Sequence, residues 1–253
     1  MRTRSAGATD RGRKRTNNED AFLVLEKLHL FAVADGVGGR EGGEIASSLA
    51  VDTLRETVPD YLGASDRTPP TASMVGEARA PSALRLAVSS ANRRIIETAR
   101  ERPELSGMGT TLTALILFGS DAHLIHIGDS RAYLLRAGTL LQLSSDHTFV
   151  AEQVKAGVLT PDQAHTSIYR HVITRALGIA EEAGPDLSRE PAQAGDIYLL
   201  CSDGLTEMVD DREIAKILED ADPSNAVARL INAANAAGGV DNITAVVVKV
   251  LEV

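Results

Sequence analysis

The sequence has few aromatic residues, no tryptophan and a single cysteine. Aromatic residues make up only 3% of the 253 residues, so Leu, Val, Ile and Ala must supply the core. The one cysteine, Cys201, excludes an intramolecular disulfide, and its place in a predicted strand indicates a buried, unreactive thiol. No apolar stretch approaches the roughly 18 residues of a membrane span, and residues 1–20 lack the apolar region of a signal peptide. We therefore expect a cytoplasmic protein that is not inserted in a membrane.

The sequence also lacks the motifs and the charge of several functional classes. It contains no Gly-x-Ser-x-Gly nucleophile elbow, no Walker A loop and no Gly-x-Gly-x-x-Gly after a strand. The formal net charge of -9 argues against nucleic acid as a partner, and a phosphate site would have to create its own local positive field. The length and the hydrophobic content of 43% are typical of one large globular domain.

Acidic residues recur at the ends of predicted strands. The apolar run 28–34 ends in Asp35 and Gly36, and the run 197–202 ends in Asp203. Three further apolar runs are flanked in the same way, by Asp129 after 124–127, by Asp241 before 243–250, and by Glu19 and Asp20 before 22–25. A turn explains any one of these positions, but it does not readily explain all five. Carboxylates gathered without a Lys cluster repel one another unless a cation neutralises them.

Such a carboxylate cluster suits a divalent metal centre. Oxygen ligands without His or Cys favour Mg²⁺ or Mn²⁺ over Zn²⁺. Two such ions about 3.5–4 Å apart could activate a shared water and clamp phosphate oxygens. Arg15, four residues before Glu19, could hold the remaining oxygens with its planar guanidinium. The set suits phosphate monoester hydrolysis, although Asp129 in a plain turn and Glu19 and Asp20 as solvated loop charges remain open alternatives.

The apolar periodicity predicts an α+β protein with antiparallel sheets covered by helices. The strand patterns are 22–25, 28–34, 112–118, 122–127, 132–136, 138–143, 196–202 and 243–250. The helix patterns are 44–58, ended by Pro59, then Ser82 to Arg100, a stretch to about Ala156, 211–219 and 224–236. Residues 60–81 contain several Gly and Pro residues and are predicted to be irregular, with no assigned role. Residues 146–178 are polar and interrupted by Gly and Pro, which is typical of a flap.

Seven short motifs, in order and spacing, resemble those of the metal-dependent protein phosphatase (2C-type, PPM) family in its bacterial form. They are Arg15-Thr16-Asn17-Asn18-Glu19-Asp20, Val33-Ala34-Asp35-Gly36-Val37-Gly38-Gly39, Gly107-Met108-Gly109-Thr110-Thr111, Gly128-Asp129-Ser130-Arg131-Ala132-Tyr133, Asp146-His147, Ser202-Asp203-Gly204-Leu205 and Asp241-Asn242. The match covers roughly residues 5–250. The resemblance implies a single domain over 1–253, built as a β-sandwich of two antiparallel sheets flanked by helix pairs (four layers, αββα), with a flap at about 146–178.

The resemblance also implies an activity: hydrolysis of Ser/Thr phosphoproteins by a hydroxide that bridges two Mn²⁺ or Mg²⁺ ions. By motif position, the resemblance implies that Asp35 bridges both ions, that Gly36 offers its carbonyl to one ion, and that Asp203 and Asp241 complete the other ion's shell. Glu19 and Asp20 act largely through coordinated waters beside Asn242, and Asp129 with Asp203 forms a third, weaker metal site. Arg15 binds the phosphate, and Arg170 or Arg175 of the flap contacts the substrate. Some relatives carry a proposed general acid, His, directly after the Asp-Gly. Val37 stands there in this sequence, so a metal-bound water or no acid must serve.

The expected partners are phosphorylated Ser/Thr proteins, including a Ser/Thr kinase, and we expect a monomer. Two rival hypotheses differ in class. A phosphatase-like regulator that binds phosphoproteins without chemistry predicts the loss of metal carboxylates, yet Asp35, Asp203 and Asp241 are all present. A two-metal nuclease or phosphodiesterase predicts a basic groove with aromatic residues, which the acidic composition does not favour.

Overall fold

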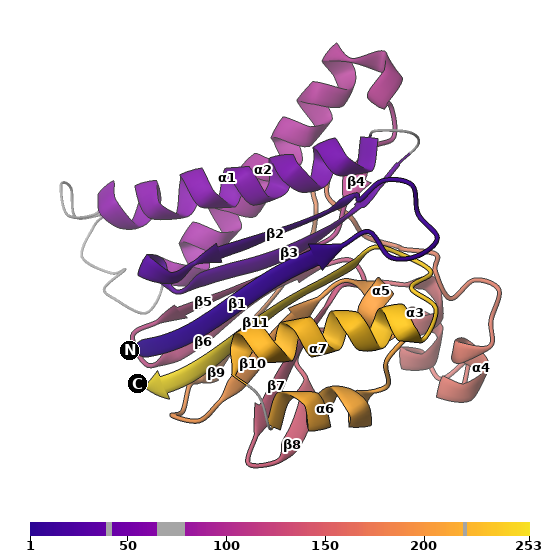
Figure 1. The fold of residues 1–253 in the computed structure, drawn as a ribbon. Helices are drawn as coiled ribbons and strands as arrows, with labels where there is room; N and C mark the ends of the chain where they lie inside the picture. Colours follow the sequence, from indigo (N-terminus) through magenta and orange to yellow (C-terminus); the bar gives the residue numbers. More distant parts are fainter. Residues whose placement is uncertain (39–41, 65–78, 220–221) are drawn as a thin grey trace.

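The computed structural model describes residues 1–38, 42–64, 79–219 and 222–253, and its strands form two antiparallel sheets (Figure 1). The first sheet has the order β1 (Arg2–Asp10), β11 (Ile243–Glu252), β10 (Ile197–Cys201), β7 (Arg131–Arg136) and β8 (Thr139–Gln142). The second has the order β2 (Asp20–Leu25), β3 (Leu30–Val37), β5 (Leu112–Phe118), β6 (Asp121–Ile127) and β9 (Asp186–Pro191), and β4 (Gly109–Thr110) pairs with the end of β3. Short connections join β2 to β3, β5 to β6 and β7 to β8, as antiparallel pairing allows, and long connections join the other neighbours.

The two sheets pack face to face around an apolar layer. Successive side chains of a strand point to opposite faces, so β3 divides its residues between two cores. Phe31 and Val33 pack against the other sheet, where they meet Leu200 of β10 and Val246 of β11. The alternate residues of β3 face the helices instead. Asp35 continues the series of Phe31 and Val33, which places its side chain at the end of the layer between the sheets.

Helices cover both outer faces. The second sheet is covered by α1 (Gly42–Ala64) and α2 (Arg79–Glu101), and the first by α6 (Asp211–Glu219) and α7 (Pro223–Ala236). Figure 1 shows these two helix pairs on opposite sides of the strands. The architecture is therefore the expected α+β sandwich of four layers, and that prediction is confirmed.

Two local predictions were wrong. Pro59 was expected to end the first helix because proline removes a hydrogen bond and crowds the preceding turn. Helix α1 instead continues to Ala64, because Tyr61 and Leu62 pack against the core beneath it. The second helix begins at Arg79 rather than at Ser82. Strand β9 was not predicted at all, and of the expected irregular stretch 60–81, residues 65–78 lie outside the described residues.

The segment 146–178, called the flap below, carries two short helices, α3 (Phe149–Lys155) and α4 (Pro161–His165). Thr148 caps α3, and Thr160 forms a capping box with Gln163 on α4. The remaining short helices are α5 (Asp203–Thr206) and two 3-10 turns, η1 (Glu26–Leu28) and η2 (Pro103–Leu105). In the parts of the chain that the structure describes, none of the helices combines the length and the apolarity that a bilayer-spanning segment requires.

Candidate active site

The strand-end carboxylates meet at one end of the sandwich. Asp20 of β2 pairs in register with Asp35 of β3. Asp203 opens α5 directly after β10, Asp241 precedes β11, and Asp129 lies between β6 and β7. Figure 1 shows α5 and the loops that lead into β2 and β11 at the same end of the sheets. The structure thus brings together five side chains that are up to 221 positions apart in the sequence, from Asp20 to Asp241.

A close approach of backbone to backbone explains the glycine after Asp35. The Gly36 amide donates to the Glu19 carbonyl at 3.1 Å. A Cβ on Gly36 would lie 2.2 Å from the Gly43 carbonyl oxygen, and a Cβ on Gly43 would lie 2.0 Å from the Glu19 carboxylate. The N-terminal turn of α1 can therefore pack on Glu19 only because both residues are glycine. The Ser47 hydroxyl also donates to the Glu19 carbonyl, at 2.6 Å.

Asp20 is a buried carboxylate of the group. Its Oδ2 accepts hydrogen bonds from the Ser202 hydroxyl at 2.7 Å and from the Thr244 hydroxyl at 2.6 Å. Its Oδ1 is buried and has no hydrogen-bond partner among the described residues. Burial raises the pKa of Asp20 to about 7 against the two hydroxyl bonds, which lower it, and the charges of Asp203 and Asp241 raise it further. A buried acceptor without a partner is costly, so this oxygen fits a cation ligand.

The other central carboxylates repel one another. Burial raises the pKa of Asp35 well above its ordinary value, and the charges of Asp20, Asp203 and Asp129 add to the effect. Burial raises the pKa of Asp129 to about 8, and burial followed by the charge of Asp241 raises the pKa of Asp203. Among the residues that the structure describes, Asp241 alone of the five pairs with Lys or Arg. Oxygen ligands with this excess of negative charge fit Mg²⁺ or Mn²⁺.

Arg15 stands at the edge of this cluster. Its Nη2 donates to Asp241 Oδ2 at 2.5 Å, and about half of its side chain remains exposed. That bond raises the pKa of Arg15, and the charges of Asp241, Glu19 and Asp203 raise it further, which shows how near they lie. A guanidinium in this position has donors left for an incoming anion.

The buried Asn242 amide fixes the loops that carry these groups. Its Nδ2 donates to the carbonyls of Arg11 and Asn17 at 3.0 and 2.9 Å. Its Oδ1 accepts from the Glu19 amide at 2.8 Å. One side chain thus ties the residues before β2 to the residue that follows Asp241, which agrees with a supporting role for Asn242.

Hydroxyl groups join Asp35 to the Asp129 loop. The Asp35 amide donates to Thr111 Oγ1 at 2.9 Å, and Thr111 Oγ1 lies 2.7 Å from the Ser130 hydroxyl. The Asp35 carbonyl accepts from the Thr111 amide at 2.9 Å and from the Thr110 hydroxyl at 2.9 Å. All three partners are fully buried. Thr110 at the end of β4 and Thr111, which lies between β4 and β5, therefore hold the backbone of the central carboxylate.

This constellation was compared with known proteins. The family model described as Protein phosphatase 2C matches residues 8–247. The chain belongs to the protein phosphatase 2C family. The serine/threonine protein phosphatase PstP of Mycobacterium tuberculosis is 42% identical over 249 residues, which are 98% of this chain and 45% of PstP. The serine/threonine phosphatase stp of Listeria welshimeri is 37% identical over 245 residues, 95% of this chain and 93% of that protein.

Solved structures of the family superimpose closely. The catalytic domain of PstP in complex with two manganese ions has a TM-score of 0.83 and 40% sequence identity, and the match covers 99% of both chains. The present chain spans less than half the length of full PstP but nearly all of the Listeria phosphatase. The fold and the family are thus shared along essentially the whole chain.

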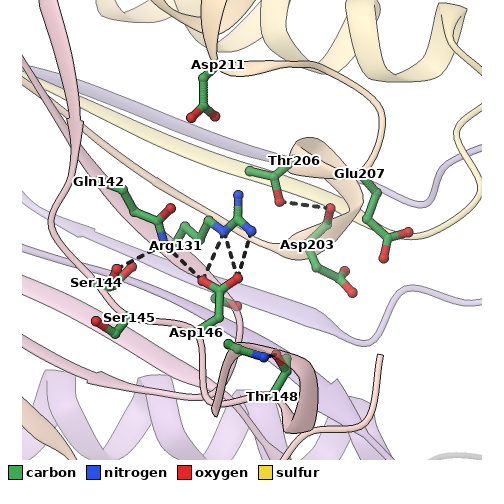
Figure 2. Close-up of polar contacts among 12 residues, drawn as sticks. Arg131, Gln142, Ser144, Ser145, Asp146, Thr148, Asp203, Thr206, Glu207 and Asp211 are labelled. Carbon is green, nitrogen blue, oxygen red and sulfur yellow. Dashed lines mark hydrogen bonds and ion pairs between the residues drawn. The ribbon is translucent and has the colours of Figure 1, made fainter. Parts of the chain in front are cut away.

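Sequence reasoning missed Glu207 in this protein phosphatase 2C site. Glu207 lies four residues after Asp203, as the C-cap residue of α5, and Figure 2 shows both side chains at this short helix. Burial and then the charge of Asp203 raise the pKa of Glu207 to about 7. Ligand atoms of His171, Asp203 and Glu207 lie within 4.8 Å of one another. The helical spacing of Asp203 and Glu207 is the signal that could have identified the second carboxylate.

A partly buried ion pair supports the base of the flap. Arg131, two residues after Asp129, holds Asp146 with both a 2.7 Å bond from Nη2 and a 3.0 Å bond from Nε (Figure 2). Gln142 adds a 2.9 Å bond to the same carboxylate. Because Asp146 begins the flap, this network fixes the start of the flap beside Asp129.

The two arginines expected to contact the substrate occupy different surroundings. The charge of Arg170 lowers the pKa of Glu207 against the effect of burial, so Arg170 lies close to this side of the site. Arg175 donates to Asp186 of β9 and lies 3.3 Å from His147 Nε2. Arg175 therefore already has partners within the protein. His171 Nδ1 lies 2.6 Å from the Glu207 carboxylate, which adds a second contact between flap and site.

Cys201, which was expected to be buried, and His126 are both enclosed by the protein. Cys201 faces the helix-side core of the first sheet, and burial raises the pKa of its thiol to about 12. His126 is buried in β6, and its ring lies 4.9 Å from that of His147. Burial lowers the pKa of His126 to about 4, so its imidazole is neutral. The expected burial of Cys201 is confirmed.

Proposed function

We propose that this chain hydrolyses phosphate monoesters of Ser and Thr residues in proteins, as a phosphatase that depends on Mn²⁺ or Mg²⁺. The observation that carries the proposal is the cluster of five carboxylates, of which only one has a cationic partner among the described residues, with a half-exposed arginine at its edge. Membership of the protein phosphatase 2C family and the two manganese ions of the PstP catalytic domain support it.

The residues present fit a two-ion site. We assign Asp35 to both ions, the Gly36 carbonyl to one, and Asp203 and Asp241 to the other. Asp20 and Glu19 would act largely through coordinated waters, and Asp129 with Asp203 would hold a weaker third ion. Bound divalent cations supply charge neutralisation, a lower pKa for an attacking water and compensation for charge on the phosphate oxygens. The free Oδ1 of Asp20 and the raised pKa values of the central carboxyls support this assignment.

The chain's own groups bind and orient the substrate. Arg15 donates two parallel hydrogen bonds to phosphate oxygens, and its bond to Asp241 holds it in place. Val37 directly follows Gly36 and cannot donate a proton, so a metal-bound water or no acid at all must serve the leaving Ser or Thr oxygen. Arg170, beside Glu207, is the flap residue we assign to the substrate.

The remaining proposals concern context. We place the protein in the cytoplasm as a monomeric phosphatase domain over residues 1–253, with the flap at about 146–178. Phosphorylated proteins, among them a Ser/Thr kinase, are the proposed substrates. A phosphatase-like regulator without chemistry is not favoured, because such a protein has no need to retain Asp20, Asp35, Asp203 and Asp241 together.

The test is hydrolysis of p-nitrophenyl phosphate and of a phosphothreonine peptide with Mn²⁺, Mg²⁺ or EDTA. The test compares wild type with Asp203→Asn and with the control Glu97→Gln, which lies at an exposed position of α2. Thermal unfolding first checks that the three proteins are equally well folded. We expect turnover that requires metal, falls at least about a hundredfold in Asp203→Asn and persists in Glu97→Gln. A wild-type protein that binds the phosphopeptide but is inert with every ion would overturn the proposal in favour of the regulator.

A further inference from the structure

The loop between β1 and β2 concentrates positive charge at the active-site end of an acidic protein. Four of its five residues 11–15 are cationic, namely Arg11, Arg13, Lys14 and Arg15, in a chain of net charge -9. All four are exposed. We call Arg11, Arg13 and Lys14 the basic rim, because Arg15 already belongs to the site.

The basic rim has a fixed backbone. The Arg13 amide donates to the Gly239 carbonyl at 2.7 Å, and the Arg11 carbonyl accepts from the Asn242 amide group. Gly12 has a φ of +76°, and a Cβ there would lie 2.1 Å from the Asp241 carbonyl oxygen. Only glycine fits so tightly against the loop that carries Asp241. The cations therefore stand at a defined place beside the carboxylate cluster.

The charges of the basic rim are available to a ligand. Of the four cations, Arg15 alone pairs with a carboxylate among the described residues. The Arg11 guanidinium donates to the neutral Thr16 carbonyl at 3.2 Å rather than to a carboxylate. Hydrogen bonds from Asn235 and Gly12 lower the pKa of Asp10, and the charges of Arg13 and Arg11 only add to this. No internal acceptor for Lys14 is seen in the described part of the chain.

We infer that the basic rim binds anionic side chains, acidic or phosphorylated, that flank the phosphorylated residue of the substrate. Lys14 and Arg13 lie one and two residues from Arg15, and an extended peptide advances roughly 3.5 Å per residue, so one to three flanking positions come within reach. The overall charge of -9 repels an acidic peptide at long range. Within a Debye length of about 8 Å, however, the attraction of the nearby cations of the basic rim dominates. This inference rests on the proposed function and adds a substrate class to it.

The test compares three phosphothreonine peptides whose flanking residues are Asp, Ala or Lys. The variants are Arg13→Glu/Lys14→Glu and a matched charge reversal on α2, Arg85→Glu/Arg93→Glu, which changes the net charge equally. For wild type we expect kcat/KM roughly threefold to tenfold higher for the acidic than for the alanine peptide, the range that two or three exposed charge pairs supply. The advantage should appear in KM, shrink with added salt, and vanish or reverse in the rim variant. Turnover of p-nitrophenyl phosphate should stay within about twofold, because it has no flanking residues.

Other outcomes would overturn the inference. These are a wild type without acidic preference, a rim variant that keeps the preference, or an α2 variant that loses it equally. If wild type hydrolyses none of the peptides, the proposed function fails. The rim is then judged by fluorescence anisotropy of the same labelled peptides, where acidic flanks must strengthen binding to wild type but not to the rim variant.

Discussion

At the scale of single residues, two hydroxyl groups determine which oxygen of Asp20 is left for a cation. Both Ser202 and Thr244 donate to Oδ2, so Oδ1 has no partner among the described residues. Ser202 also accepts from the Thr244 amide at 2.9 Å, which links β10 and β11 at this point. The orientation of the Asp20 carboxylate is therefore set by Ser202, directly after β10, and by Thr244 of β11.

Removing one hydroxyl should weaken metal binding. We expect Thr244→Val to lower the affinity for Mn²⁺ about tenfold, the lower end of the effect of groups that orient a metal ligand. Thr244→Ser keeps the hydroxyl and should bind nearly as wild type. Isothermal titration with Mn²⁺ measures both variants. Equal affinities of Thr244→Val and wild type would contradict the orienting role.

Arg15 should not be replaceable by lysine. Lysine keeps the charge but presents a single ammonium group instead of a planar fork. We expect Arg15→Lys to lower kcat/KM for a phosphothreonine peptide about tenfold, and Arg15→Ala about a hundredfold, in line with hydrogen bonds to charged groups. Steady-state kinetics with Arg93→Ala as control measures this. If Arg15→Lys retains full activity, the fork is not required.

At the scale of elements, the end of the flap is held by one buried side chain of α2. Asn92 Oδ1 accepts from the Gly178 amide at 2.7 Å, and its Nδ2 donates to the Ala180 and Glu181 carbonyls at 2.9 and 3.0 Å. Leu177 also pairs with Thr110, whose hydroxyl donates to the Asp35 carbonyl. The flap exit is thus one residue away from the backbone of the central carboxylate.

Asn92→Ala removes these bonds at once. We expect a loss of about 2–4 kcal/mol in the free energy of unfolding, because a buried N–H and two carbonyls lose their partner. Hydrogen exchange should rise most at residues 174–184. Denaturant titration and exchange mass spectrometry check both effects, and Arg93→Ala on the exposed side of α2 is the control. An exchange increase spread evenly over the protein would argue against a local anchor.

The same elements show what sequence patterns can predict. β3, β5 and β11 are long apolar runs, so these strands were predicted correctly. β9 has mostly exposed polar residues at a sheet edge, and therefore no apolar pattern marks it. The passage of α1 through Pro59 depends on the core contact of Leu62, which local propensity does not contain. Glu207 escaped notice because a solvent-accessible Glu on a helix is commonplace until the fold places it beside Asp203.

At the scale of the whole molecule, folding gathers carboxyls whose repulsion should make stability depend on pH. Burial raises the pKa of Asp20 from 3.8 to about 7 and that of Asp129 from 3.8 to about 8. At pH values between the unfolded pKa of 3.8 and these folded pKa values, the carboxyls of the folded protein still hold protons that the unfolded chain has already released. The contribution of these carboxyls to stability without metal is therefore largest below the unfolded values and falls as the pH rises from about 4 to 8.

We accordingly expect EDTA-treated protein to unfold several degrees higher at pH 5.5 than at pH 8, since each kcal/mol shifts Tm by about 2–4 °C in a domain of this size. Asp20→Asn cannot ionise at this position and should show a smaller difference, whereas Glu97→Gln should match wild type. Excess Mn²⁺ should remove or reverse the difference, because cations bind the ionised carboxylates. Calorimetry at both pH values measures each case. If metal-free wild type is more stable at pH 8, or if Asp20→Asn keeps the full difference, the buried carboxyls are not the source of the pH dependence.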